Sequence, residues 1–174
     1  AIWYVIKDKG SSIDVILDHN TTAKVAYNTS GEYIEYSSAS IKTQVIADTQ
    51  DWHSTARLIT ANEVATITNT STFDGSSDTA FYLDGTGENK QTKVSTTQGA
   101  SQYAWLYDYT DSCTSSGCNV EDSSTNGYWT SSVVSDNSNR AWILSKRGYL
   151  GISDTNSESN YGIRPVINID KSDL

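Results

Sequence analysis

The residues of this sequence that could do chemistry include two cysteines and two histidines. Cys113 and Cys118 are separated by four residues, one of which is Gly117. A zinc site needs more ligands than these, and neither His19 nor His53 lies near the cysteines in the sequence. A disulfide that closes this short loop is the favoured interpretation and would indicate an oxidising compartment. Two free thiols are the alternative.

Four carboxylates flank the cysteine loop and could together bind a hard cation. Calcium takes several oxygen ligands, but the regular Asp-x-Asp-x-Asp-Gly spacing of a calcium loop is missing. Solvated loop charges are the favoured interpretation, so we expect no cofactor and find calcium unsupported. The four residues are Asp108, Asp111, Glu121 and Asp122.

Nucleophilic catalysis has little support in the sequence. His19 and His53 could each act as a base, but neither lies beside a nucleophile motif, and no Gly-x-Ser-x-Gly is present. We therefore expect that this protein is not an enzyme.

Lys146 and Arg147 form a basic pair in an acidic chain. The formal net charge of −9 disfavours nucleic acid as a partner and is typical of a soluble protein. The Arg147 guanidinium could bind a carboxylate of an acidic partner through two N–H donors. The alternative is a solvated hairpin turn before Gly148.

The length and composition predict a folded chain with one domain, residues 1–174. Five Trp and 11 Tyr can anchor a core although only 36% of the residues are hydrophobic. We see no signal peptide and no transmembrane run, and expect no membrane contact by this segment. Because Met is absent even at position 1, we expect a processed product or an excised fragment, with any anchor upstream of residue 1.

The first half of the sequence predicts strands followed by two helices. Residues 2–6 and 13–17 are apolar and flank a turn, which predicts a β-hairpin, and residues 22–27 predict a further strand. Residues 40–51 have helical spacing of apolar residues, with Ser40 as the candidate N-cap. After a short strand at 57–59, Thr60 and Glu63 match a capping box that opens a second helix ending at 69–71.

The second half predicts a loop-rich region, residues 70–102, and then strands. Residues 103–107 predict one strand, and 166–169 predict a terminal strand that pairs with the N-terminal hairpin. Strands and helices that do not alternate indicate an α+β fold with antiparallel sheets, two short helices and much loop. We expect Trp129 and Trp142 in the core, and a structural role for Arg164 through an ion pair or stacking.

Two parts of the sequence resemble C-type-lectin-like domains of the formylglycine-generating-enzyme type. Residues 57–63, Arg-Leu-Ile-Thr-x-x-Glu, are similar to the Arg-Leu-Pro-Thr-x-x-Glu segment that opens the second helix of that family. The family's terminal block of Tyr-Trp-Ser-Ser, Ala-Trp and Gly-x-Arg-Pro-Val is similar to residues 128–132, 141–142 and 162–166. This group includes bacterial surface proteins and the variable proteins of diversity-generating retroelements.

The sequence departs from the family pattern at several points. Ile59 replaces the usual Pro. The Glu-Pro-Asn, Gln-Pro-Asp and Trp-Asn-Asp motifs of calcium-dependent sugar-binding lectins are missing, since Pro165 is the only proline. The catalytic cysteines of the formylglycine-generating enzymes have no counterpart either, because Cys113 and Cys118 sit in a loop of their own.

In retroelement variable proteins, the diversified ligand-binding residues lie between the Trp and the final strand of the terminal block. The resemblance therefore implies a ligand-binding surface of polar loops on a rigid scaffold, in which Tyr149 is either a contact or a core residue. By position the implied residues are Ser135, Asp136, Asn137, Ser138, Asn139, Lys146, Arg147, Tyr149, Ser153, Asp154, Asn156, Ser159 and Asn160.

The resemblance thus implies an extracellular or cell-surface, adhesin-type domain. Its surface within residues 128–161 would bind a protein or a glycan on another cell or on a host. The alternatives are an enzyme of the formylglycine-generating type, which would require a reactive cysteine or a metal, and a purely structural pilus or cell-surface module.

Overall fold

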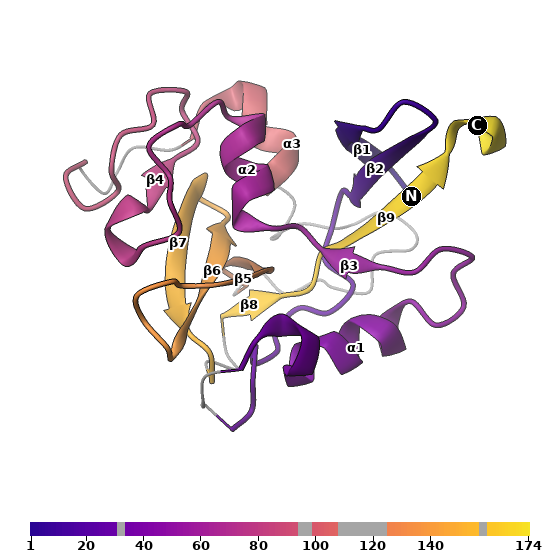
Figure 1. The fold of residues 1–174 in the computed structure, drawn as a ribbon, viewed down its shortest axis with the longest axis horizontal. Coiled ribbons are helices and arrows are strands. Elements are labelled where there is room, and N and C mark those ends of the chain that lie inside the picture. The colour runs from indigo at the N-terminus through magenta and orange to yellow at the C-terminus, as the bar shows by residue number, and fades with distance from the viewer. Residues whose placement is uncertain (31–33, 94–98, 108–124, 157–159) are drawn as a thin grey trace.

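The computed structural model describes residues 1–30, 34–93, 99–107, 125–156 and 160–174, which form two sheets with helices beside them (Figure 1). The fold is α+β, with mostly antiparallel pairing, as the sequence predicted. The first sheet has the order β1 (Trp3–Asp8), β2 (Ser12–Leu17), β9 (Pro165–Asp170), β3 (Arg57–Leu58). The second has the order β4 (Phe81–Tyr82), β7 (Tyr149–Asp154), β6 (Arg140–Ser145), β5 (Gly127–Val133), β8 (Tyr161–Gly162).

The predicted N-terminal hairpin and its pairing with the terminal strand are both confirmed. β1 pairs antiparallel with β2, and β2 pairs antiparallel with β9, with Val15 opposite Ile167. The chain passes from β8 in the second sheet to β9 in the first through Ile163 and Arg164 alone. The last strands of the chain therefore connect the two sheets directly.

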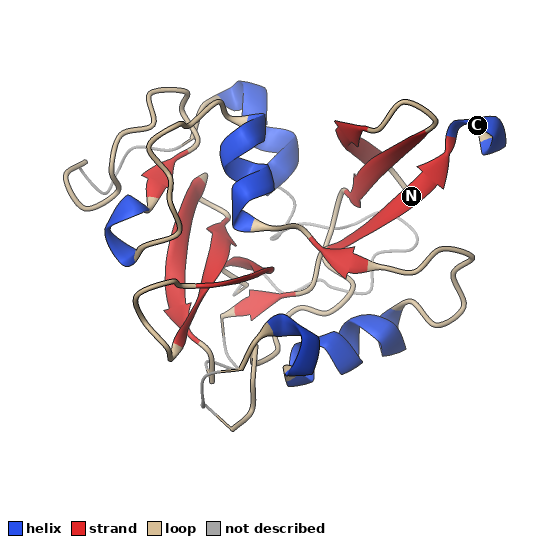
Figure 2. Ribbon diagram, viewed as in Figure 1, coloured by secondary structure: helices blue, strands red, loops and turns tan. Residues whose placement is uncertain are grey.

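The second sheet is buried on both faces, which makes it the rigid centre of the molecule. One face carries Trp142 and Leu144 and packs against α2 (Ala61–Ile67) and α3 (Ala104–Tyr107). The other carries Trp129 and packs against α1 (Ser40–Asp48). Figure 2 shows α2 and α3 side by side and α1 on the opposite side of the strands. Trp129 and Trp142 are fully buried, which confirms that both belong to the core.

Four short 3-10 helices lie beside these elements and complete the described secondary structure. Two of them, η1 and η3, directly precede α1 and α3 in the chain. Their bounds are Tyr36–Ser38 for η1, Ser77–Thr79 for η2, Ser101–Tyr103 for η3 and Lys171–Asp173 for η5.

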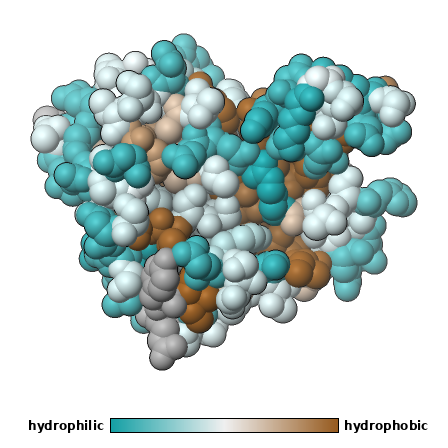
Figure 3. Space-filling model, viewed as in Figure 1, coloured by the Kyte–Doolittle hydropathy of each residue, from teal (hydrophilic) through white to brown (hydrophobic). Residues whose placement is uncertain are grey.

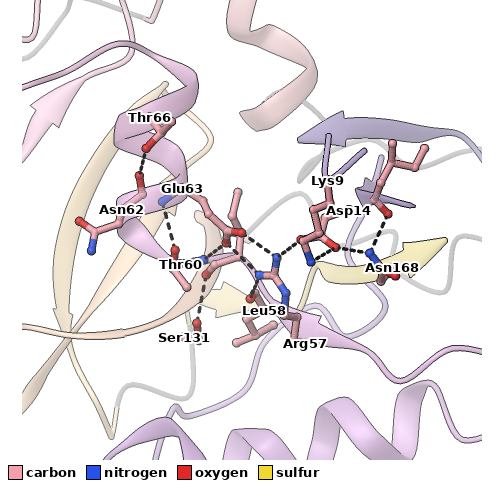
Figure 4. Close-up of polar contacts among 12 residues, drawn as sticks. Lys9, Asp14, Arg57, Leu58, Thr60, Asn62, Glu63, Thr66, Ser131 and Asn168 are labelled. Carbon is pink, nitrogen blue, oxygen red and sulfur yellow. Dashed lines mark hydrogen bonds and ion pairs between the residues drawn. The ribbon is translucent and has the colours of Figure 1, made fainter. Parts of the chain in front are cut away.

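The predicted capping box of α2 is confirmed, and it belongs to a larger polar network (Figure 4). The Glu63 amide donates to Thr60 Oγ1 at 3.1 Å, and the Thr60 amide donates to Glu63 Oε2 at 2.8 Å. Arg57 binds both Glu63 oxygens, at 2.8 and 2.7 Å, and also donates to Asp14 at 2.9 Å. Asp14 receives further bonds from Lys9 and Asn168. The network thus ties β2, β3, β9 and α2 together.

Arg164 is fully buried and lies where the two sheets meet. Its guanidinium donates to the backbone carbonyls of Leu17, Leu106 and Trp105. Its charged carbon lies 5.3 Å from the centre of the Tyr128 ring. Arg164 therefore has the predicted structural role and stacks on Tyr128. In the hydrogen bonds described, its partners are backbone carbonyls instead of the carboxylate of an ion pair.

Two of the predicted strands are wrong. Residues 103–107 form the end of η3 and then α3 instead of a strand, because the Trp105 and Leu106 carbonyls bind Arg164 rather than a neighbouring strand. A short apolar run alone does not distinguish the two structures. Residues 22–27 form no strand: Thr22 makes an isolated bridge to Ile163, and the Val25 amide donates to the Tyr161 carbonyl at 2.9 Å.

The start and end of the first helix also differ from the prediction. Ala39 is the N-cap residue, and the Ser40 hydroxyl instead accepts from the Thr29 amide at 3.1 Å. The helix ends at Asp48 rather than Asp51, where the Thr49 hydroxyl donates back to the Val45 carbonyl at 2.7 Å.

Candidate functional site

The predicted ligand-binding residues divide between the two ends of the second sheet. β6 and β7 pair antiparallel, with Arg140 opposite Asp154 at one end and Ser145 opposite Tyr149 at the other. Each strand has six residues, so its end residues lie roughly 17 Å apart at about 3.3 Å per step between residues. The structure therefore gives two separate surfaces where the sequence predicted one.

The first surface, which we call the distal loops, consists of residues 134–139 and 154–156. Its exposed side chains are those of Ser135, Asp136, Ser138, Asn139, Asp154 and Asn156, whereas Asn137 is half-buried. The two loops are joined by a bond from the Thr155 amide to the Asn139 carbonyl at 2.9 Å. This end of the sheet thus presents the polar side chains that the resemblance implied.

Several of these polar groups already have partners within the protein. The Asp136 carboxylate accepts from the backbone and the hydroxyl of Ser77, at 2.8 and 3.0 Å. Asp154 forms an ion pair with Arg140 at 3.0 Å. The distal loops are therefore held in place by polar contacts with Arg140 and with Ser77, the first residue of η2.

The second surface is a small cavity of about 180 Å³ that we call the basic–tyrosine pocket. It gathers Lys146, Arg147 and Tyr149 from the predicted set, and its remaining lining residues are Asn126, Ser145 and Tyr161. Asn160, also predicted, does not line the pocket, but its carbonyl accepts from the amide of the lining residue Asn126 at 2.7 Å. Three predicted residues therefore meet in the pocket, and a fourth is bonded to its lining.

The turn between β6 and β7 positions the basic pair of this pocket. Ser145 and Tyr149 pair across a loop of three residues, and Gly148 takes a positive φ of 76°. This is the usual place for glycine in a three-residue hairpin loop. A Cβ on Gly148 would lie 2.7 Å from the Gly99 backbone, so the position also requires the smallest residue. The interpretation of Lys146-Arg147 as a hairpin turn is confirmed, and it presents both cations.

A third cation of this region, Lys90, was not predicted from the sequence. Its Nζ lies over the Tyr149 ring, 3.9 Å from the centre, which places positive charge beside the pocket. Lys90 belongs to the loop-rich region 70–102, whose fold no periodicity predicts. Asn126 precedes the predicted surface, and Tyr161 lies at its end without being named as a contact; the parallel pairing of β5 with β8, Gly127 opposite Tyr161, brings the two residues together.

Tyr161 supplies a neutral polar group to this pocket. Burial and the neighbouring Tyr149 raise the pKa of Tyr161, and a hydrogen bond with Ser153 opposes them. The phenol therefore keeps its proton at neutral pH and can donate or accept. Cations from Lys146, Arg147 and Lys90 beside a phenol are suited to hold a carboxylate. Ser153 itself is half-buried on the face of β7.

The remaining predictions concern residues that the structure does not describe. Ser159, Cys113 and Cys118 lie outside the described residues, as do Asp108, Asp111, Glu121 and Asp122. Among the residues that are described, no group of three or more His, Cys, Asp or Glu side chains could hold a metal ion. Within the same residues, no helix has the length and apolar character needed to cross a membrane.

Comparison with known proteins found no relative of this chain. No protein-family model, no curated protein and no solved structure matches it.

Proposed function

We propose that this chain is an extracellular ligand-binding domain with a C-type-lectin-like fold, displayed on a bacterial surface. It recognises a protein or a glycan on another cell or on a host. Its recognition surface belongs to the C-terminal third of the chain and is carried by the sheet that is buried on both faces. The proposal involves binding without chemistry.

The observation that carries the proposal is the meeting of Lys146, Arg147 and Tyr149 in the basic–tyrosine pocket. The family resemblance implies all three as ligand contacts. An acidic chain with a formal charge of −9 gathers two cations in this pocket and a third beside it. The chemistry that fits them is a ligand with an exposed carboxylate, such as an acidic sugar or an acidic side chain.

A binding assay with carboxylate-bearing probes tests this function. Glycans printed in pairs, with and without a carboxylate sugar, and acidic peptides beside their amidated counterparts serve as probes. We expect binding to the carboxylate member of one kind of pair, and weaker binding at higher salt, because exposed charges are screened.

Two variants test the basic pair. One is the double variant Lys146→Ala and Arg147→Ala, and the other is Lys7→Ala, the control for loss of one exposed cation. The double variant should lose about tenfold to a hundredfold in affinity, since a hydrogen bond to a charged group contributes about 1.5–3 kcal/mol. Lys7→Ala should bind as the parent does, since Lys7 lies on β1 in the other sheet. Equal binding by the double variant and the parent would show that the basic pair is not the contact.

The retroelement version of the proposal has its own test in the DNA around the gene. A reverse-transcriptase gene and a near-copy of the codons for residues 128–165 should lie close by. If sequencing of the flanking DNA finds neither, a fixed adhesin remains and diversification is ruled out.

A further inference from the structure

A cavity of about 520 Å³ lies outside the predicted surface, between the first sheet and the segment that follows α1. Trp3, Leu17 and Ile167 line it from β1, β2 and β9, and Trp52 lines it from the connection between α1 and β3. Its size is within the range of small-ligand sites. In Figure 3, apolar surface is exposed in the hollowed region between this sheet and the helix below it.

Two tryptophans form an aromatic corner in this cavity. The ring centres of Trp3 and Trp52 lie 5.5 Å apart, with the planes at 78° to each other. Both side chains are only half-buried, whereas Trp129 and Trp142 are fully buried. The face of an indole carries negative π-charge, and Trp is the strongest of the aromatic residues at binding a cation against that face.

The polar lining of the cavity is acidic. The Asp48 carboxylate is fixed by three donors: Thr21 Oγ1 at 2.6 Å, Thr22 Oγ1 at 2.7 Å and Gln44 Nε2 at 2.8 Å. Asp51 is exposed at the rim. The described residues that line the cavity include no Lys or Arg; the other titratable groups in the lining are His19, His53 and the amino group of Ala1.

These features select the charge of the ligand. Two carboxylates repel an anion and attract a cation, and the aromatic corner adds to the attraction. A bare metal ion is not suited to the site, since the described residues offer no cluster of three acidic or imidazole ligands. Leu17 and Ile167 favour a ligand that also has an apolar part. We propose that this cavity binds an organic ammonium ion with an apolar body.

The test uses benzyltrimethylammonium as the probe, with benzyl alcohol as a neutral aromatic, phenylacetate as an anion and N-acetylglucosamine as a sugar. Titration calorimetry should give saturable binding of the ammonium ion and at least tenfold weaker binding of the other three. In NMR spectra the indole N–H signals of Trp3 and Trp52 should shift, and those of Trp129 and Trp142 should stay. Comparable binding of the alcohol, the anion or the sugar would overturn the proposal.

Two variants locate the binding. Trp52→Ala should lower the affinity for the ammonium ion by roughly tenfold or more. Circular dichroism checks that this variant keeps its fold. Asp51→Asn should lower the same affinity by roughly threefold to tenfold. Because Asp51 is exposed, this change does not endanger folding. Asp170→Asn is the control, since it removes the same charge from an exposed site that does not line the cavity. If Asp51→Asn and Asp170→Asn behave alike, the acidic rim does not select the ligand.

Discussion

The guanidinium of Arg164 is fully buried, and its hydrogen bonds go to carbonyls from two distant parts of the chain. Leu17 ends β2, whereas Trp105 and Leu106 belong to α3. Burial lowers the pKa of Arg164, and the neighbouring Tyr128 and Asp18 oppose this effect. Burial also raises the pKa of Tyr128 to about 12, so this phenol remains neutral and donates to the Leu106 carbonyl at 2.6 Å. A single side chain therefore joins the first sheet, α3 and the second sheet.

Replacing Arg164 should be among the most destabilising single changes in the protein. Arg164→Ala removes three hydrogen bonds to backbone carbonyls and leaves a cavity in the core, and we expect a loss of about 3–5 kcal/mol in the free energy of unfolding. Urea unfolding followed by tryptophan fluorescence measures it. Arg140→Ala is the matched control, because Arg140 pairs with Asp154 at the surface, and should cost below about 1 kcal/mol. Similar losses in the two variants would contradict the role of Arg164.

At the scale of elements, the Arg57 network links α2 to strands β2, β3 and β9 of the first sheet. Burial by itself raises the pKa of Asp14, but hydrogen bonds from Lys9, Asn168 and Arg57 outweigh it and hold this pKa below its ordinary value of 3.8. In the same way, burial raises the pKa of Glu63, and bonds from Arg57 and the Thr60 backbone bring it below 4.5. Both carboxylates therefore favour the folded state when they are ionised.

The sign of the resulting pH dependence follows from these shifts. A carboxyl whose pKa is depressed in the folded state stabilises the fold above its unfolded pKa, and loses this contribution as pH falls through the folded value. We expect stability at pH 7 to exceed stability at pH 3. Glu63→Gln should lower stability at pH 7 by about 1–3 kcal/mol, and the difference from the parent should shrink toward pH 3. Urea titrations at the two pH values measure both effects. A constant difference would mean that Glu63 does not contribute through its charge.

The elements also show what the sequence could predict. The capping box, the hairpin and the terminal strand depend on neighbouring residues or on alternating apolar residues, and all three are present. The failures at 103–107 and 22–27 have one cause, since both segments bond to the Ile163–Arg164 region. A partner about 60 to 140 residues away leaves no local pattern. The split of the predicted surface has a different and local cause: the β6–β7 hairpin places its turn at one end of the sheet and the residues before β6 and after β7 at the other.

At the scale of the whole molecule, scaffold and surface should respond differently to substitution. Trp142 packs against Phe73, with ring centres 4.9 Å apart, in the core beside α2. Trp142→Ala should therefore lower the free energy of unfolding by about 3–5 kcal/mol. Ser138 and Asn156 are exposed on the distal loops, and their joint replacement by Ala should change stability by less than about 0.5 kcal/mol per site. Thermal unfolding of the two variants measures this. A large loss from the loop variant would mean that these side chains hold the scaffold.

Both ends of the described chain lie in the half of the molecule that contains the first sheet, whereas the distal loops lie in the other half (Figure 1). This arrangement gives the molecule a polarity. A tether joined at either end would hold the first sheet and leave the distal loops pointing outward, whichever end it used. A domain built in this way could be moved between host proteins, at the tip of one or within a loop of another, and would still present the same loops to its surroundings.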